Sequence, residues 1–98
     1  MGFVQIIELQ TTRFEEVDAL HETWLAETEG IRRTVSELVV KDRDKPGRYL
    51  VIVEFASYED AEANNDIPAT GRFAEALGPL LDAPPIFHNL DLVRYDRT

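Results

Sequence analysis

The sequence predicts an α+β fold of the ferredoxin-like kind, with strands and helices in the order βαββαβ. Four segments rich in β-branched and aromatic residues are separated by two regions whose apolar residues recur at helical spacing. The second and third strand segments flank a Pro-Gly turn, as in a β-hairpin. Because strand–helix–strand connections are right-handed, both helical regions should lie on one face of a four-stranded antiparallel sheet. We expect residues 1–98 to form one such domain.

The first strand and the first helix are expected within residues 3–30. Phe3 to Gln10 is apolar on both parities, which is typical of a central strand covered on both faces. Thr12 and Glu15 have the spacing of a capping box, so a helix should start there. Gly30 is suited to end this helix, because glycine adopts a left-handed backbone without steric cost. The helix carries an apolar stripe at three- and four-residue steps, formed by Phe14, Val17, His21, Trp24, Leu25 and Thr28.

A β-hairpin is expected to follow. The chain is β-branched and alternating from Arg32 to Lys41, and Tyr49 to Phe55 is a second strand-like run. Between them Pro46 fixes one turn dihedral and Gly47 permits positive φ. The two runs should therefore pair as the second and third strands.

The second helical region is expected in two pieces. Ser57 has the position of a helix cap. The run 64–66 and Pro68 should break this helix, because Asn, Asp and Pro all compete with helical backbone bonding. A second piece should start near Thr70, and the Gly-Pro pair at 78–79 should kink or tighten its last turn.

The fourth strand is expected over Ile86 to Tyr95, after the Ala-Pro-Pro sequence at 83–85. With both helical regions on one face, the other face of the sheet is left bare although its strands carry apolar residues there. An exposed apolar patch of that extent is a liability for a lone domain. We therefore expect a homodimer, in which a second copy of the chain covers this face.

Composition limits the partners and the chemistry. The net charge of -9 would repel both nucleic acid and an anionic membrane surface, so neither is expected as a partner. There is no cysteine, which excludes disulfides, thiolate metal sites and cysteine nucleophiles. No apolar run approaches the roughly 20 residues of a membrane helix and no secretory signal is apparent, so a cytoplasmic location is expected. The preference for arginine over lysine fits a GC-rich bacterial genome.

Two residues of the first helix are candidates for a site. His21 lies in the apolar stripe and should point toward the sheet, where it is either a core histidine satisfied by one hydrogen bond or an acid/base group in a pocket. Trp24 is either core packing or a flat surface on which an aromatic ligand stacks.

Further candidates lie in the second half of the chain. Tyr58 has the same two interpretations as Trp24. Asn64 and Asn65 lie at the helix break, where they either form the turn or bind a phenolate or carbonyl oxygen through their amides. His88 is either a strand-end residue or a second polar group of the pocket.

Other chemistries have little support. Glu37 and Glu54 lie on the two hairpin strands and are able to face each other, for which a salt-bridged sheet face is a better account than a carboxylate dyad. With two distant histidines and no cysteine, no metal-binding spacing is present. Phosphate-binding glycine loops and a Ser-His-Asp signature are also absent.

Nearly the whole chain resembles the antibiotic biosynthesis monooxygenase-like domains of the dimeric α/β-barrel superfamily. The stretch that carries the resemblance is Val53 to Glu62, followed by the break from Asn64 to Pro68 and by Phe73. Two positions depart from that pattern, since Tyr58 stands where tryptophan is common and Asn64 where many members have histidine. Because no histidine lies between residues 31 and 87, a haem-degrading activity is disfavoured.

The resemblance implies a cofactor-independent monooxygenase that binds a small aromatic or quinonoid compound between helices and sheet, without metal or flavin. In this hypothesis His21 is the base, Asn64 or Asn65 is the amide donor, and Trp24, Tyr58 and His88 bind the substrate. Two alternatives stay open, because one fold serves many functions. The first alternative is a non-catalytic ligand-binding or regulatory module. The second is a structural dimerisation domain, and this alternative predicts a filled interior without a pocket beside His21 and Trp24.

Overall fold

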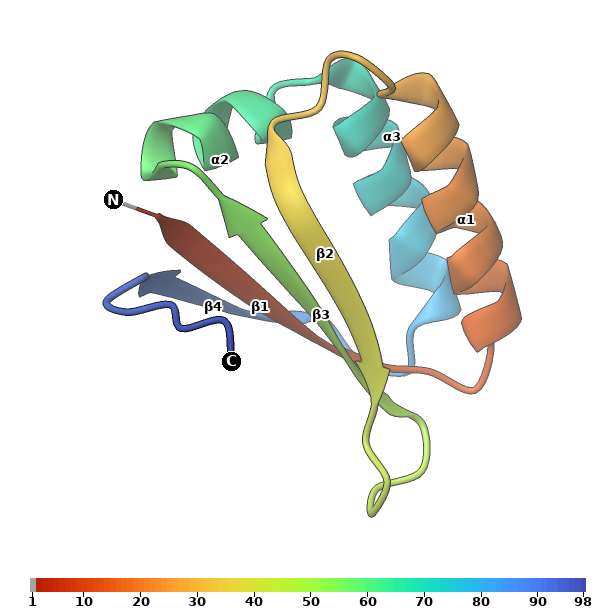
Figure 1. The fold of residues 1–98 in the computed structure, drawn as a ribbon. Coiled ribbons are helices and arrows are strands. Elements are labelled where there is room, and N and C mark those ends of the chain that lie inside the picture. Colours follow the sequence, from red (N-terminus) through yellow and green to blue (C-terminus); the bar gives the residue numbers. More distant parts are fainter. Residues whose placement is uncertain (1) are drawn as a thin grey trace.

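The computed structural model describes residues 2–98 and has the element order that the sequence predicts. Figure 1 shows the sheet with the helices on one side of it and the C-terminal segment on the other. The ferredoxin-like α+β fold is thereby confirmed. The elements are β1 (Phe3–Gln10), α1 (Phe14–Glu27), β2 (Thr34–Lys41), β3 (Arg48–Phe55), α2 (Tyr58–Asn65), α3 (Pro68–Leu77), the 3₁₀ turn η1 (Gly78–Leu80) and β4 (Ile86–Asp91).

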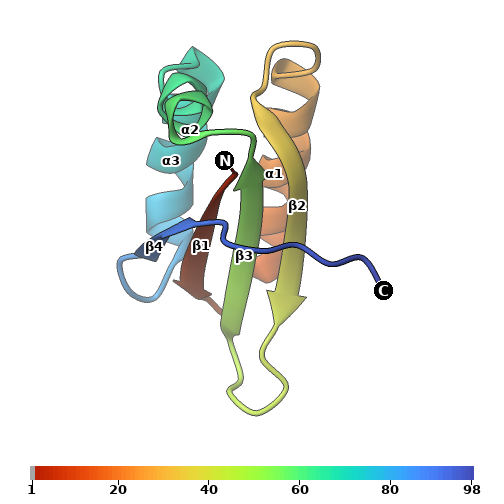
Figure 2. The ribbon, with the colours of Figure 1, turned by 60° about the vertical axis from the view of Figure 1, so that its left-hand side comes forward.

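The four strands form one antiparallel sheet in the order β2-β3-β1-β4. The register places Ile6 of β1 opposite Ile52 of β3 and opposite His88 of β4, so these three side chains share one face. Figure 2 shows the helices on one side of the sheet, with the C-terminal segment crossing the other side. The central strands are β1 and β3, and the central position of β1 is the one that its apolar sequence predicts.

The start of α1 differs from the prediction. The capping box of Thr12 and Glu15 does not form, because the N-cap residue is Arg13 and no side chain caps the helix there. The neighbouring Thr11 is used instead, and its hydroxyl accepts the Arg13 N–H at 2.9 Å and donates to the Leu80 carbonyl at 2.7 Å. Thr11 is 1% exposed, and it therefore joins the start of α1 to η1 through the interior.

The other boundaries follow local backbone chemistry. Gly30 and Gly47 adopt positive φ, of 82° and 81°, although α1 itself ends earlier, at Glu27. The Ser57 side chain caps α2 by accepting the Asp60 N–H. The second helical piece starts at Pro68 rather than near Thr70, since proline is favoured in the first turn of a helix.

The fourth strand is shorter than predicted and ends at Asp91 instead of Tyr95. Asp91 lies opposite Phe3, the first residue of β1, so the later residues of the segment have no β1 residue to pair with. A single further hydrogen bond joins the Leu92 N–H to the Gly2 carbonyl.

The two faces of the sheet differ in cover. On the helical face the core consists of two clusters of buried residues, Phe3, Val53, Phe55 and Ala61 in one and Leu9, Val17 and Leu77 in the other. The opposite face, which we call the open face, exposes the apolar residues Leu38, Val40, Ile86 and Leu90. In residues 2–98 no helix has the length and apolar character needed to cross a membrane.

Candidate functional site

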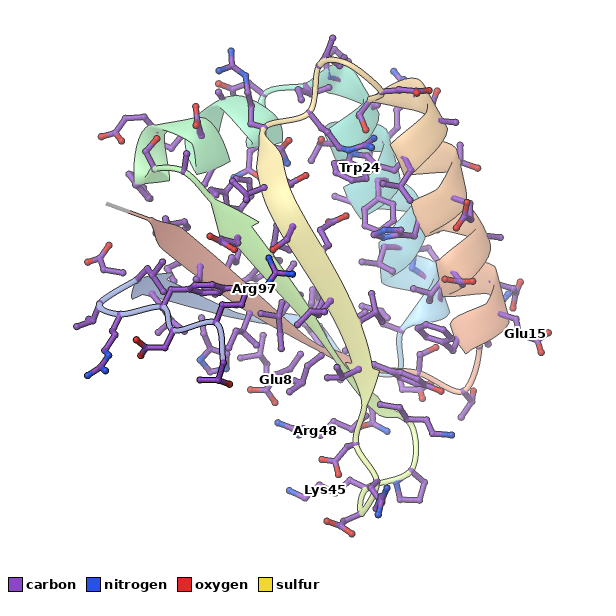
Figure 3. The ribbon with its side chains drawn as sticks, in the orientation of Figure 1. Glu8, Glu15, Trp24, Lys45, Arg48 and Arg97 are labelled. Atoms are coloured by element: carbon purple, nitrogen blue, oxygen red, sulfur yellow. The ribbon has the colours of Figure 1, made fainter. Side chains whose placement is uncertain are left out.

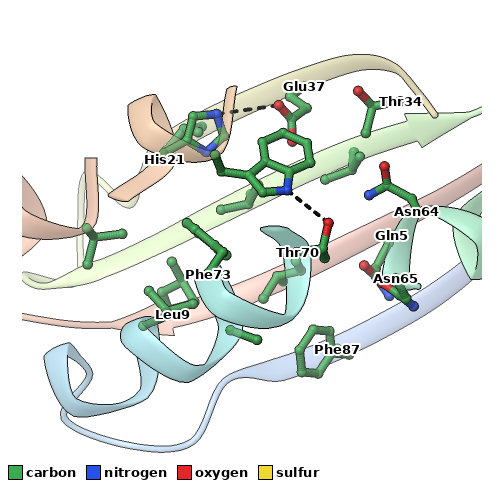
Figure 4. A pocket seen from close by; sticks show the side chains of 18 of the residues that line it. Gln5, Leu9, His21, Thr34, Glu37, Asn64, Asn65, Thr70, Phe73 and Phe87 are labelled. Carbon is green, nitrogen blue, oxygen red and sulfur yellow. Dashed lines mark hydrogen bonds and ion pairs between the residues drawn. The ribbon is translucent and has the colours of Figure 1, made fainter. Parts of the chain in front are cut away.

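A cavity of about 210 Å³ lies between the helical face of the sheet and helices α1, α2 and α3. Figure 4 shows it from close by. Its walls are mostly apolar, and its aromatic members are Phe14, Trp24, Phe55, Phe73 and Phe87. A small number of polar groups in a largely apolar enclosure is typical of small-molecule sites. The polar groups that line it include Gln5, His21, Glu37, Asn64, Asn65 and Thr70.

His21 projects from α1 across the cavity toward β2. Its Nε2 lies 3.4 Å from Oε2 of Glu37, and the two side chains are 19% and 17% exposed. The imidazole also lies beside two aromatic rings, with its centroid 5.9 Å from that of Trp24 and 6.3 Å from that of Phe73. The prediction that His21 points toward the sheet is confirmed, and its polar partner is a carboxylate.

The environment raises the pKa of His21 above its ordinary value. The principal cause is the contact with the Glu37 carboxylate, 3.4 Å from Nε2, and the charges of Glu37, Asp18 and Glu22 act in the same direction. Partial burial opposes them, because it disfavours the charged imidazolium. His21 is therefore held near a negative charge that favours its protonated form.

Glu37 was not among the predicted site residues, and the expectation that it faces Glu54 is wrong. Glu37 lies opposite Val53, which is buried under the helices, whereas Glu54 lies opposite Ser36 and accepts the Ser36 hydroxyl at 3.2 Å. The two carboxylates thus point to opposite faces of the hairpin. The alternation of β2 is the sequence feature from which the inward direction of Glu37 could be predicted. The apolar run 38–40 obscures it, because residues of both parities there are apolar.

Trp24 is held by a single polar contact. Its indole Nε1–H donates to the Thr70 hydroxyl at 2.9 Å, and the side chain is buried between the helices and the sheet (Figure 3). The Arg32 guanidinium lies 6.0 Å from the ring centroid. The ring therefore forms a wall of the cavity and is also part of the packed interior. Stacking of an aromatic ligand on Trp24 stays a prediction.

Asn64 and Asn65 both line the cavity from the end of α2. Asn64 is 6% exposed, and its side-chain oxygen accepts the backbone N–H of Arg33 at 3.0 Å. Because a backbone N–H only donates, the oxygen must face Arg33, which leaves the amide NH₂ of Asn64 as the group able to donate elsewhere. Asn65 is exposed. The fixed donor of the pair is therefore Asn64.

The other two candidates do not line the cavity. Tyr58 is 53% exposed and packs edge-on against Phe3, with ring centroids 5.2 Å apart. His88 lies on the open face, where its Nε2 is 2.6 Å from Oε2 of Glu8. The structure thus brings His21, Trp24, Asn64 and Asn65 together and leaves Tyr58 and His88 elsewhere.

Together these features define a ferredoxin-like α+β domain with an aromatic-walled cavity lined by a histidine, a glutamate and two asparagines. Within residues 2–98 no group of three or more metal-ligating side chains is present. No protein-family profile matches the chain, and no curated protein sequence does either.

Solved structures of the same fold are found at low sequence identity. A candidate antibiotic biosynthesis monooxygenase from Caulobacter crescentus CB15 is similar with a TM-score of 0.84 and 16% identity, over 95% of this chain and 91% of that chain. Rv0793 from Mycobacterium tuberculosis is similar with a TM-score of 0.82 and 14% identity, over 99% of this chain and 100% of that chain. SnoaB is a cofactor-independent oxygenase from Streptomyces nogalater, solved as an asparagine-to-alanine variant. It is similar with a TM-score of 0.81 and 14% identity, over 96% of this chain and 95% of that chain. The chain thus has the fold of the antibiotic biosynthesis monooxygenase-like structures, as its sequence predicts.

Proposed function

We propose that this protein is a cofactor-independent monooxygenase-like protein that binds a small aromatic or quinonoid compound in the cavity between helices and sheet. The observation that carries the proposal is that His21 and the amide of Asn64 line one largely apolar cavity with aromatic walls. A base, an oxyanion-binding amide and a dry pocket are what a substrate needs when its own reactivity toward dioxygen does the rest. The fold shared with SnoaB, described as a cofactor-independent oxygenase, supports the same function.

The size of the cavity favours a small ligand. Its volume of about 210 Å³ is below the roughly 300–1,000 Å³ of pockets for drug-sized molecules. One or two fused rings fit this space better than an extended polycyclic compound does. The faces of Trp24 and Phe73 supply flat apolar walls against such rings.

The proposed reaction uses dioxygen as oxidant. His21 takes a proton from a phenol or an activated carbon, and the amide of Asn64 or Asn65 binds the resulting oxyanion. The substrate anion gives one electron to O₂, the two radicals combine to form a C–O bond, and the peroxide takes the proton back. Loss of water then breaks the O–O bond, so that a substrate RH₂ and O₂ give RO and H₂O.

A second copy of the chain is the proposed partner. The open face exposes Leu38 by 59% and Ile86 by 54%, in a sheet otherwise packed on one side only. A two-fold partner on this face would remove the exposed apolar surface from water. Replacing Leu38 by Asp should then shift the protein to a monomer in sedimentation experiments, whereas an unchanged assembly would exclude this interface.

A non-catalytic ligand-binding module is the second candidate, and the same cavity supports it. The third, a purely structural domain, predicts a filled interior, which does not agree with the cavity beside His21 and Trp24.

Native mass spectrometry of the purified protein followed by oxygen-uptake assays tests the proposal. The mass spectrum should show a dimer. In the oxygen-uptake assay, 1,4-dihydroxynaphthalene should be consumed faster than it autoxidises, to give a hydroxylated quinone and water. Saturable binding of 2-naphthol without enhanced oxygen uptake from any hydroxyaromatic tested would favour the binding module. Absence of both binding and turnover would refute a ligand site in this cavity.

A further inference from the structure

We propose that Glu37 is the positioning residue for His21, so that a histidine–carboxylate pair, and not His21 alone, is the acid/base unit of the cavity. This inference rests on the proposed function, since it assigns a role within the same site. Sequence patterns did not identify Glu37, and it is the residue of β2 that places a negative charge beside the imidazole.

The backbone of β2 aims Glu37 into the cavity. Thr34 pairs with Phe55 and Ser36 with Glu54, so one extra residue, Val35, is accommodated by a register shift between them. The result is that Thr34 and Glu37, three positions apart, both line the cavity, whereas strict alternation would place them on opposite faces. Such bulges re-aim side chains and are frequent next to active sites.

The surroundings of His21 make Glu37 the group that acts on the ring directly. Asp18 and Glu22 lie on the same helix as His21 and act on it through their charge, whereas the Glu37 carboxylate lies within ion-pair distance of the ring, at 3.4 Å from Nε2. From α3 the neighbour is the ring of Phe73, which lies nearly perpendicular to the imidazole and does not ionise. Among the described ion pairs, His21 takes part in one, and its partner is Glu37.

This geometry selects one tautomer of the neutral imidazole. A carboxylate only accepts, so Glu37 keeps the proton on Nε2 and leaves the lone pair on Nδ1. In the proposed reaction Nδ1 takes the substrate proton, the imidazolium pairs with the Glu37 carboxylate, and the same proton later returns to the peroxide. Glu37 neither gains nor loses a proton in this sequence, which is the role of the carboxylate in other histidine–carboxylate pairs.

The test compares Glu37→Gln with Glu22→Gln, which removes the same charge from a position that has no direct contact with the ring. The chain has two histidines, so NMR titration resolves them, and a His88→Gln variant assigns the signals. Glu37→Gln should move the His21 midpoint to lower pH, and Glu22→Gln should move it much less. Equal midpoints in the wild type and Glu37→Gln, or equal shifts in both variants, would overturn the inference.

Turnover supplies a readout that a merely structural glutamate would not change. Because neutral His21 is the proposed base, oxygen uptake with 1,4-dihydroxynaphthalene should rise as pH increases through the His21 pKa. Glu37→Gln should displace this rise to lower pH and reduce its plateau, since the ring is no longer oriented. A reduced plateau with an unmoved midpoint would mean a structural role only, and would refute the proposal.

A second variant covers the case in which Glu37→Gln does not fold. Glu37→Asp keeps the charge but withdraws the carboxylate from Nε2, so its midpoint should lie between those of the wild type and an uncharged variant. A wild-type midpoint in Glu37→Asp would show that contact is not required and would contradict the inference. The NMR titration needs no substrate, so absence of turnover would count against the proposed function alone.

Discussion

Each face of the sheet carries a histidine–glutamate pair, and the two pairs differ in what else surrounds the carboxylate. On the helical face His21 and Glu37 are 3.4 Å apart, both mostly enclosed and bordered by Trp24 and Phe73. On the open face His88 is 2.6 Å from Glu8 and is 45% exposed. The same two residue types therefore occur in a cavity and on a surface of one molecule.

The carboxylate on the open face is shared with a permanent cation. Arg48 donates to Glu8 at 2.9 Å and to Asp42 at 2.7 Å, so that Glu8 is compensated whether or not His88 is charged (Figure 3). Glu37 has no such cation among the ion pairs of residues 2–98. The two pairs therefore differ in more than contact distance. Among the ion pairs of residues 2–98, Glu8 has two cationic partners, whereas Glu37 has His21 alone.

The largest expected difference between the pairs concerns turnover. Replacing His21 by Gln should lower the rate of the proposed reaction by roughly 10²–10⁴-fold, the usual contribution of a general base. Replacing His88 by Gln should leave the rate within about twofold, because that side chain does not line the cavity. Steady-state oxygen uptake by the two variants measures this. Equal losses would show that the site is not in the cavity.

The second difference concerns packing on the two faces. Leu9 is 3% exposed in the core under α1, and Leu9→Ala should lower the free energy of unfolding by roughly 2–5 kcal/mol. Leu38 is 59% exposed on the open face, and Leu38→Ala should change the free energy of unfolding by less than about 0.5 kcal/mol in the monomer.

Urea unfolding at two protein concentrations separates the possible causes. If a second copy covers the open face, Leu38→Ala should lower the free energy of unfolding at high protein concentration and leave it unchanged on dilution. A large loss that is independent of concentration would mean that Leu38 is packed within its own chain.

A smaller effect is expected from the hydrogen bond that fixes Trp24. Thr70→Val keeps the shape but removes the acceptor of the indole N–H, which should cost roughly 1–3 kcal/mol of unfolding free energy. Thr23→Val is the matched control, because its hydroxyl only bonds to the Ala19 carbonyl on an exposed helix face. Fluorescence of Trp24, the single tryptophan, should also change in Thr70→Val and not in the control. Identical behaviour of the two variants would show that Thr70 does not hold the ring.

The sequence predicts the fold well because its strongest signals are local. The Pro-Gly turn, the capping residue Ser57 and the helix break before Pro68 each act within a few residues, and all three are found in the structure. The failure at Thr12 is of the same local kind. Of two adjacent threonines, it is Thr11 whose hydroxyl bonds next to the start of α1, because it also donates to the Leu80 carbonyl, and α1 starts without a side-chain cap.

The site is predicted less completely because faces of strands are decided at long range. His21 and Trp24 lie on a helix whose apolar stripe predicts the direction of their side chains, and both line the cavity. His88 lies on a strand that is apolar on both parities and Glu37 lies beside the apolar run 38–40, so pairing register decides the face of each. In β2 the shift near Val35 also interrupts the alternation. Such a shift is not apparent from composition or spacing.

The smallest expected effect sharpens the comparison most, because the two pairs should respond to pH in opposite directions. The pKa of His21 is raised, chiefly by Glu37, so this pair stabilises the fold fully below the ordinary histidine pKa of about 6.5. Its contribution is lost as pH rises through the raised value. The pKa of Glu8 is lowered, first by the hydrogen bond from His88 and then by Arg48. That contribution is present above the ordinary glutamate value of 4.5 and is lost as pH falls through the lowered value.

Unfolding free energies of the wild type, Glu37→Gln and Glu8→Gln, measured across pH, test this difference. The gap between the wild type and Glu37→Gln should be present in mild acid and shrink toward alkaline pH, whereas the gap for Glu8→Gln should be present at neutral pH and shrink in acid. Both gaps should be modest, since these side chains remain partly exposed to water. Parallel pH profiles for the two variants would mean that the pairs are electrostatically alike, and the distinction between the cavity pair and the surface pair would fail.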